Sequence, residues 1–265
     1  MLLTIDIGNT SVHFGVFDGE QLLSTWRLRT DINRLPDEYA MLIIGLLNAA
    51  GFQPADIHDC SLSSTVPSLT QSFQELTARY FHVQTLTMGP GVKSGIRILY
   101  DPPRDVGADR IIDALAAIRL YGPPLIVVDY GTGTVFDALS GDGGYLGGAV
   151  APGIGLSAEA LFARASRLYR VDLEHPTTAI GKNTIHALQS GILLGYVGLV
   201  EGLVARFQQE LGGGARVIGT GGYAESIARA TTVFDIVNPE LTLIGLRLVH
   251  ELNRGTGEAK ARSTR

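Results

Sequence analysis

Residues 2–10 read Leu-Leu-Thr-Ile-Asp-Ile-Gly-Asn-Thr, and residues 125–134 read Leu-Ile-Val-Val-Asp-Tyr-Gly-Thr-Gly-Thr. Each stretch begins as an apolar, β-branched run that predicts a strand, and continues into Asp-x-Gly and hydroxyl residues. Asp129 follows Asp6 by 123 positions in a chain of 265 residues, so both halves open in the same way. The repeat predicts two similar α/β domains, each with one turn suited to binding phosphate.

The sequence after each copy predicts the same order of elements. After the first copy we expect strands at 12–17 and 22–28, a helix at 36–50, a strand at 57–64, a helix at 67–80 and a strand at 83–86. After the second we expect strands at 125–129, 134–139 and 144–150, helices at 154–168 and 183–211, a strand at 216–219 and a final helix at 239–252. Three antiparallel strands followed by alternating helix and strand are typical of the ribonuclease-H-like core of actin, sugar kinases and Hsp70-type ATPases.

We therefore predict an α/β fold of two ribonuclease-H-like (actin-like ATPase) domains with an interdomain cleft. The domains are expected at 1–121 and 122–253, because Gly122-Pro123-Pro124 ends a predicted helix. The final helix, although it lies within 122–253, is expected to pack back on the first half. Residues 87–106 are rich in glycine and proline and predict a long functional loop. The polar residues 254–265 are expected to be a disordered tail.

Composition restricts the possible functions. The net charge of −5 argues against a nucleic-acid surface that works by neutralising phosphates. No window contains the roughly 18 uninterrupted apolar residues of a membrane span. Cys60 is the only cysteine, so an intrachain disulfide is impossible. These features predict a cytoplasmic protein without a nucleic-acid or membrane partner.

The turn after Asp6 is the first candidate site. A tight Gly8-Asn9-Thr10 turn presents backbone N–H groups and a hydroxyl to anionic oxygen. Asp6 at the strand end could bind Mg²⁺ through water, since Mg²⁺ keeps much of its hydration shell. The alternative is an ordinary Asx turn.

The corresponding turn at Asp129 combines a carboxylate with the hydroxyls of Thr132 and Thr134. Such oxygen ligands suit a hard cation, and the chemistry of the residues does not separate Mg²⁺ from K⁺. A turn or helix-cap aspartate is the alternative. Thr220-Gly221-Gly222, between a strand and a helix, could let a flat base lie close to the backbone, or could be a plain turn.

Asp109 and Arg110 begin the helix that precedes the second copy. A carboxylate here could take a proton from a substrate hydroxyl, and the guanidinium could bind a substrate carboxylate. The alternatives are an aspartate that complements the helix dipole and a surface salt bridge.

Several motifs in a fixed order resemble the type III pantothenate kinases, which make 4′-phosphopantothenate in the first step of coenzyme A biosynthesis. They are Asp6–Thr10, Gly89–Gly95 (Gly-Pro-Gly-Val-Lys-Ser-Gly), Gly107–Arg110, Asp129–Thr134, Gly147–Gly153, Gly181–Thr184, Gln189–Gly191 and Thr220–Gly222. The resemblance runs from Asp6 to about Leu248, and the order of the motifs is more specific than any one of them.

The resemblance implies a role for each matched residue. ATP would be bound by Asp6, Ile7, Gly8, Asn9, Thr10, Ser11, Val12, His13 and Thr132, with Mg²⁺ on Asp6. Pantothenate would be bound by Tyr100, Gly107, Ala108, Asp109, Arg110 and Thr184, with Arg110 and Thr184 on its carboxylate and Asp109 as the catalytic proton acceptor. Asp129 would ligate a monovalent cation, K⁺ or NH₄⁺.

The resemblance also implies a homodimer with pantothenate near the subunit interface. The helix at 183–211 carries apolar and glycine residues, Ile192, Leu193, Gly195 and Leu199, that could pack against a second copy. Two other functions stay open: another small-molecule kinase of the same superfamily, and a regulatory or accessory protein built on the kinase fold. Asp109 and Arg110 speak against the regulator, because it would need neither.

Overall fold

The computed structural model describes residues 1–164 and 170–254. Two compact units divide the chain. The first contains Met1–Ile96, Pro102–Ala116 and the residues from Leu241 onward, and the second contains Arg97–Asp101 and Ala117–Glu240.

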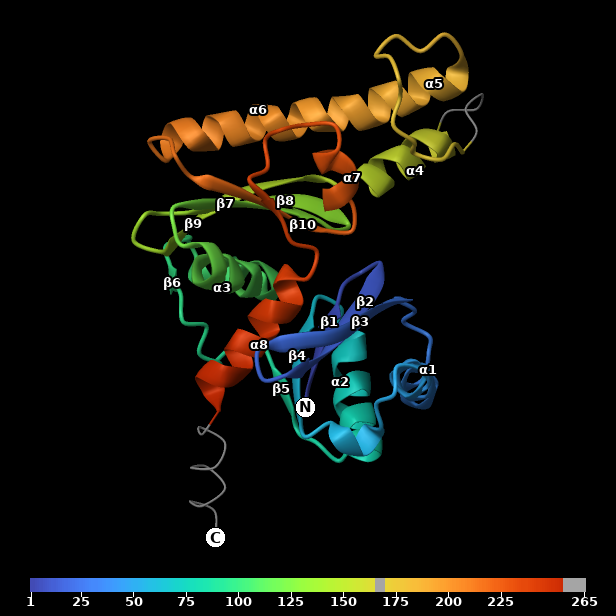
Figure 1. Cartoon of the computed structure of the whole chain (residues 1–265), viewed down its shortest axis with the longest axis vertical. Coiled ribbons are helices and arrows are strands. Elements are labelled where there is room, and N and C mark those ends of the chain that lie inside the picture. The colour runs from blue at the N-terminus through green and yellow to red at the C-terminus, as the bar shows by residue number, and fades with distance from the viewer. Residues whose placement is uncertain (165–169, 255–265) are drawn as a thin grey trace. The chain divides into compact units, whose positions relative to one another are not determined.

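The first unit is built on a five-stranded sheet in the order β3-β2-β1-β4-β5 (Figure 1). Its strands are β1 (Leu2–Ile7), β2 (Ser11–Asp18), β3 (Gln21–Arg29), β4 (Asp59–Ser64) and β5 (Thr85–Thr87). Strands β1, β2 and β3 pair antiparallel, whereas β4 and β5 run parallel to β1. Three antiparallel strands followed by alternating helix and strand are the order of elements predicted for a ribonuclease-H-like core.

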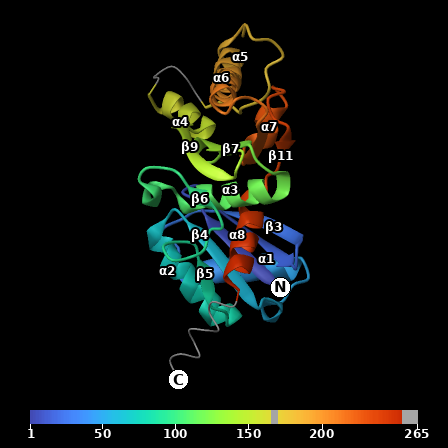
Figure 2. The same ribbon diagram turned by 90° about the vertical axis from the view of Figure 1, so that its left-hand side faces the viewer.

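Helices cover both faces of this sheet because the side chains of a strand alternate between faces. Leu3, Ile5 and Ile7 of β1 pack with helices α1 (Pro36–Ala49) and α2 (Pro67–Leu76). Leu2 lies in a separate cluster with Phe17, the start of α3 (Ala108–Tyr121) and α8 (Leu241–Asn253). Figures 1 and 2 show α8 across the face of the sheet opposite α1 and α2. The prediction that the final helix packs on the first half is therefore confirmed.

The second unit repeats this topology and adds one strand. Its sheet has the order β11-β10-β7-β8-β9-β6. The strands are β6 (Arg97–Ile98), β7 (Leu125–Tyr130), β8 (Gly133–Leu139), β9 (Gly144–Pro152), β10 (Arg216–Gly221) and β11 (Ile236–Val237). Strands β9, β8, β7, β10 and β11 correspond in order and direction to β3, β2, β1, β4 and β5. The extra strand, β6, pairs parallel with β9 at the sheet edge.

One face of the second sheet is covered by a long helical segment, Thr184–Glu210. It consists of α5 (Thr184–Gln189), the π-helical turn η4 (Ser190–Leu194) and α6 (Gly195–Glu210). Figure 1 shows α6 lying along the sheet. The segment is long and apolar enough to cross a membrane by length and composition, but Val197, Val200 and Val204 pack into the core of the unit. Two shorter helices, α4 (Ile154–Arg164) and α7 (Ala224–Ala228), complete the unit.

Most sequence-based expectations of fold agree with the structure, and the differences have physical causes. The predicted loop at 87–106 contains β6 and the 3₁₀ turn η3 (Pro103–Asp105). The compact units are not the continuous ranges 1–121 and 122–253, because α8 packs on the first sheet and 97–101 joins the second. Residues 165–168 of a predicted helix, and 255–265 of the predicted tail, lie outside the described residues.

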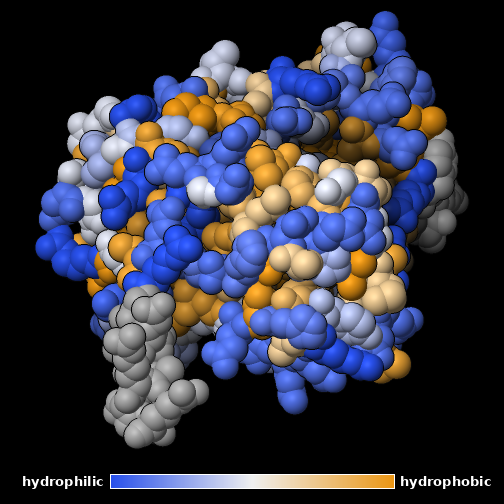
Figure 3. Space-filling view, turned by 60° about the horizontal axis from the view of Figure 1, so that its bottom comes forward, coloured by the Kyte–Doolittle hydropathy of each residue, from blue (hydrophilic) through white to orange (hydrophobic). Residues whose placement is uncertain are grey.

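The apolar face predicted for helix packing against a second copy is partly wrong. Leu193 is only 1% exposed and belongs to the core of its own unit. Ile192 and Leu199 pack partly against the same core. On the face drawn in Figure 3, hydrophobic residues lie among hydrophilic ones.

Candidate active site

The turn after Asp6 is fixed by hydrogen bonds from within the first unit. The Gly8 N–H donates to the Ser11 carbonyl over 3.0 Å and closes the turn between β1 and β2. The carbonyl of Gly8 accepts from the Thr30 hydroxyl (2.6 Å), and that of Ile7 accepts from the Thr65 N–H (2.9 Å). Because both carbonyl oxygens accept hydrogen bonds inside the unit, they do not point at an anion bound by the turn. Asn9 and Thr10, at the tip, are exposed.

Strand pairing places a hydroxyl beside each of the two repeated aspartates. Asp6 of β1 is the register partner of Ser63 of β4, and Asp129 of β7 is the register partner of Thr220 of β10. The hydroxyls of Ser63 and Thr220 are buried and have no hydrogen-bond partner among the described residues. Sequence reasoning did not assign a role to Ser63. Its only signal was a hydroxyl near the end of the strand predicted at 57–64.

Two glycines pack tightly in the turns near Asp129, and any side chain at either position would force neighbouring atoms to move. Gly221 has φ +87°, and a Cβ there would lie 2.4 Å from Asp129 Oδ1 and 2.6 Å from the Tyr130 nitrogen. A Cβ on Gly153 would lie 2.3 Å from the Thr132 carbonyl oxygen. Three chain segments therefore meet closely around one half-buried carboxylate.

A tyrosine from α6 ties this turn to the end of β9. The Tyr196 hydroxyl donates to the Pro152 carbonyl and lies 3.1 Å from the Thr134 hydroxyl. Burial raises the pKa of Tyr196, and raises the pKa of the neighbouring Tyr130 further. Both phenols therefore stay neutral, and neither competes with Asp129 for a cation by carrying negative charge.

The donor set around Asp129 fits a hard cation. It provides the Asp129 carboxylate and, from its register partner, the Thr220 hydroxyl, which has no hydrogen-bond partner among the described residues. Within residues 1–164 and 170–254, no three histidine, cysteine, aspartate or glutamate side chains gather closely enough to bind a metal ion. An Mg²⁺ ion on Asp6 would thus take most of its ligands from water and phosphate, as Mg²⁺ does in many phosphotransferases.

Asp109 lies in the first turn of α3, where Gly107 makes room for it. Asp109 Oδ1 accepts from the Arg110 N–H over 3.0 Å, and a Cβ on Gly107 would lie only 2.4 Å from that oxygen. The Gly107 carbonyl accepts from the Ile111 N–H at the start of the helix. Asp109 and Arg110 are both half-buried, so their charged groups reach solvent.

Thr184 is held at the start of α5 by an N-cap. The Asn183 side chain accepts from the His186 N–H over 2.9 Å, which satisfies an N–H of the first turn. Gly181 packs so closely on this turn that a Cβ would lie 2.3 Å from the Ala187 nitrogen. Thr184 itself is exposed.

The structure distributes the predicted site residues between the two units. Asp6–His13 and Gly107–Arg110 belong to the first unit, and Tyr100, Asp129, Thr132 and Thr184 to the second. Within the second unit the Asp129 and Thr132 turn meets Gly153 and Gly221. Tyr100 lies instead over β9, where its ring centroid is 6.4 Å from that of Tyr145.

Comparison with known sequences gives one consistent result. The family model described as type III pantothenate kinase matches residues 2–206. The chain is 51% identical over 253 residues to a type III pantothenate kinase of Dehalococcoides mccartyi (strain CBDB1), with 96% of each chain covered. It is also 51% identical over 254 residues to that of Roseiflexus sp. (strain RS-1), with 96% of this chain and 100% of the relative covered.

Solved structures agree on the fold at low sequence identity. A structure assigned to the Baf family of transcriptional activators, from Campylobacter jejuni, has a TM-score of 0.61 at 19% identity and covers 95% of this chain and 98% of its own. The ethanolamine utilization protein EutJ from Carboxydothermus hydrogenoformans has a TM-score of 0.54 at 14% identity, covering 93% and 89%. At these identities the likeness concerns the fold alone.

Proposed function

Because the chain belongs to the type III pantothenate kinase family, we propose that it transfers the γ-phosphoryl group of ATP to pantothenate. The product is 4′-phosphopantothenate, and the reaction is the first step of coenzyme A biosynthesis. The observation that carries the proposal is 51% sequence identity, over 96% of this chain, to two proteins named type III pantothenate kinase. Two features of the structure support it: the turns after Asp6 and after Asp129 each contain a glycine packed closely against neighbouring backbone.

In this mechanism the residues of the first unit bind the triphosphate and accept the proton. The turn from Asp6 to His13 positions the phosphates, with the Ile7 and Gly8 carbonyls turned to other partners. When bound on Asp6 through water, Mg²⁺ offsets the charge that develops on the transferred group. Asp109 orients the primary hydroxyl of pantothenate and takes its proton as the hydroxyl oxygen bonds to the γ-phosphorus. The bond between that phosphorus and the β–γ bridging oxygen breaks, and ADP leaves. Gly107 keeps the Asp109 carboxylate in place, since any side chain at 107 would displace it.

In the second unit, Thr132 contacts ATP, and Asp129 with Thr220 holds a monovalent cation, K⁺ or NH₄⁺. The closely packed glycines around Asp129 support this assignment, because they fix the carboxylate against two backbone turns. Arg110 and Thr184 bind the carboxylate of pantothenate, and Tyr100 contacts the same substrate. No covalent phosphoenzyme is required.

We also propose that the enzyme is a cytoplasmic homodimer. Gly191, Gly195 and Gly198 follow one another at helical spacing in Thr184–Glu210, and a Cβ at each would meet nothing within 4 Å. All three are exposed, so this face could accept another helix at short distance. This glycine face replaces the apolar face predicted from the sequence, because Leu193 is used inside its own unit.

The deciding experiment is an assay of purified protein with ATP, Mg²⁺, K⁺ and pantothenate, with phosphopantothenate detected by mass spectrometry. We expect product in the complete mixture and much less when K⁺ is omitted, with Na⁺ as the ionic-strength control. A folded protein that makes no phosphopantothenate with either K⁺ or NH₄⁺ would refute the proposal. A panel of other small alcohols would then test the alternative of a different small-molecule kinase.

A further inference from the structure

Residues 97–101 leave the first unit to form an edge of the second sheet. Arg97 and Ile98 of β6 pair with Gly144 and Tyr145 of β9, and the Leu99 N–H donates to the Tyr145 carbonyl over 2.8 Å. Only these five residues of the predicted 87–106 loop belong to the second unit. Because β6 pairs through only two residues, side-chain contacts must also fix its register against β9.

Two glycines of β9 leave space for the side chains of this segment. A Cβ on Gly144 would lie 2.8 Å from Leu99 Cδ1, and a Cβ on Gly147 would lie 3.0 Å from Tyr100 Cδ2. Gly147 also has φ +126°, which side-chain-bearing residues rarely adopt, and it directly follows Leu146, where the register of β9 against β8 shifts by one residue at a β-bulge. The bulge and the missing side chain together make room for the Tyr100 ring.

Tyr145 supplies the other wall of this space. Its ring is fully buried and meets the Tyr100 ring edge-on, with 6.4 Å between centroids. The Tyr145 hydroxyl donates to Asp137 Oδ1 over 2.6 Å, and Asp137 is only 3% exposed. This buried hydrogen bond fixes the Tyr145 ring, which in turn restricts Tyr100.

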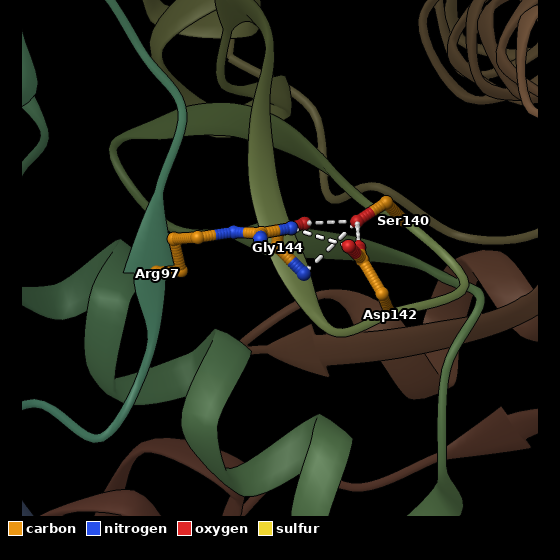
Figure 4. Close-up of polar contacts among 4 residues, drawn as sticks. All are labelled: Arg97, Ser140, Asp142 and Gly144. Carbon is orange, nitrogen blue, oxygen red and sulfur yellow. Dashed lines mark hydrogen bonds and ion pairs between the residues drawn. The ribbon is translucent and has the colours of Figure 1, made fainter.

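An ion pair at the start of β6 fixes the register. The Arg97 guanidinium bonds to Asp142 in the turn between β8 and β9, and the Ser140 hydroxyl donates to the other oxygen of Asp142 over 2.5 Å (Figure 4). The Gly144 N–H donates to the Ser140 hydroxyl over 2.9 Å, which ties the network to β9. Arg97 and Asp142 are more than half exposed, so the pair selects one register and adds little stability.

We propose that Gly147, Tyr145 and the Arg97–Asp142 ion pair are positioning residues that fix the Tyr100 ring for the pantothenate substrate. This group, called the Tyr100 seat, acts through Tyr100 and not on the reacting atoms. The inference rests on the proposed function only in taking Tyr100 as a substrate contact. It predicts that disturbing the seat weakens pantothenate binding and leaves ATP binding and the chemical step nearly intact.

The central test is a double-mutant cycle between Gly147→Ala and Tyr100→Ala. Because a Cβ at 147 would displace the Tyr100 ring by a few tenths of an ångström, and alanine is strained at φ +126°, we expect Gly147→Ala to raise KM for pantothenate by about three- to tenfold, with kcat and KM for ATP within about twofold of wild type. In the Tyr100→Ala background, Gly147→Ala should add almost nothing, because it acts through the missing ring. Gly212→Ala is the matched control, since Gly212 also has a positive φ, +80°, but a Cβ there meets nothing within 4 Å.

A second variant covers the case in which Gly147→Ala does not fold. Arg97→Met should raise KM for pantothenate by up to about fivefold, the limit for an exposed ion pair, and Arg97→Lys should restore part of it. Unchanged KM for pantothenate in these folded variants, or effects that add to those of Tyr100→Ala, would overturn the seat. If the wild-type protein makes no phosphopantothenate, the proposed function fails separately. The double-mutant cycle is then measured with pantothenate affinity by calorimetry in place of KM. If the wild-type protein binds no pantothenate, the proposal of the Tyr100 seat is overturned as well.

Discussion

Replacing Gly221 by alanine tests how tightly the second unit is built around Asp129. Gly221 has φ +87°, so any L side chain carries a left-handed backbone penalty of about 1–2 kcal/mol. The new Cβ would also lie 2.4 Å from Asp129 Oδ1 and 2.7 Å from the Tyr130 carbonyl oxygen. Relieving such overpacking in an interior costs about 1–3 kcal/mol more. We therefore expect Gly221→Ala to lower the free energy of unfolding of the second unit by about 2–5 kcal/mol.

Gly212→Ala separates the two contributions. Gly212 has nearly the same backbone angle, φ +80°, but a Cβ there meets nothing within 4 Å. It should cost only the backbone penalty of about 1–2 kcal/mol. The loss in free energy of unfolding caused by Gly221→Ala, minus the loss caused by Gly212→Ala, is thus the steric contribution of the Asp129 and Tyr130 contacts.

The assay must report on the second unit. The only tryptophan, Trp26, lies in the first unit, so its fluorescence is unsuitable. Hydrogen exchange in increasing urea, followed by mass spectrometry of peptides covering β7 and β10, measures the opening of the strands that carry Asp129 and Gly221. In the enzyme assay, Gly221→Ala should also raise the K⁺ concentration needed for half-maximal activity, because the Asp129 carboxylate must move. The reasoning is refuted if Gly221→Ala destabilises β7 and β10 no more than Gly212→Ala does.

Three further predictions follow from single groups. Asp109→Asn should lower kcat by about 10²–10⁴-fold and leave ATP affinity, measured by calorimetry, unchanged, since the amide cannot accept the proton; near-normal turnover would contradict its role. Burial raises the pKa of the Cys60 thiol to about 12, so iodoacetamide at pH 8 should label it in urea but hardly at all in the native protein, as mass spectrometry would show. The Ser140 hydrogen bond and Arg97 lower the pKa of Asp142 from 3.8 to about 2, so whatever stability this carboxylate contributes is present above pH 4 and lost as pH falls through 2. An NMR titration of Asp142 should therefore show a midpoint near 2, and a midpoint near 4 would exclude the network.

Much of the fold follows from local sequence patterns. The repeated strand with Asp-x-Gly predicts both sheets, and the Asp18-Gly19 hairpin and helix-starting prolines such as Pro36 and Pro67 mark the neighbouring elements. These signals depend on side-chain periodicity and turn chemistry over a few residues. For the same reason the aspartates that could carry chemistry, Asp6, Asp109 and Asp129, could be chosen before any tertiary contact was known.

Other features have no local signal. Strand β6 has two residues and no periodicity, and it exists because its backbone pairs with β9. The close approach of α8 to α3, in which a Cβ on Gly245 would lie 2.3 Å from the Ile112 carbonyl oxygen, has no local signal either. Leu193 has the same apolar character as an interface residue, and only packing shows that its own unit buries it.

The sequence by itself thus determined the two repeated units and the order of their elements along the chain, and it supplied the candidate residues for binding phosphate, cation and pantothenate. Only the tertiary structure showed at which glycines a side chain would clash with its neighbours, and which side chains contact the candidate residues. Local patterns report the face of each strand or helix that is buried, whereas contacts such as Gly147 with Tyr100 and Gly221 with Asp129 join residues 47 and 92 positions apart. Those contacts arise from how the strands and loops of the folded unit meet, which the periodicity of one element does not encode.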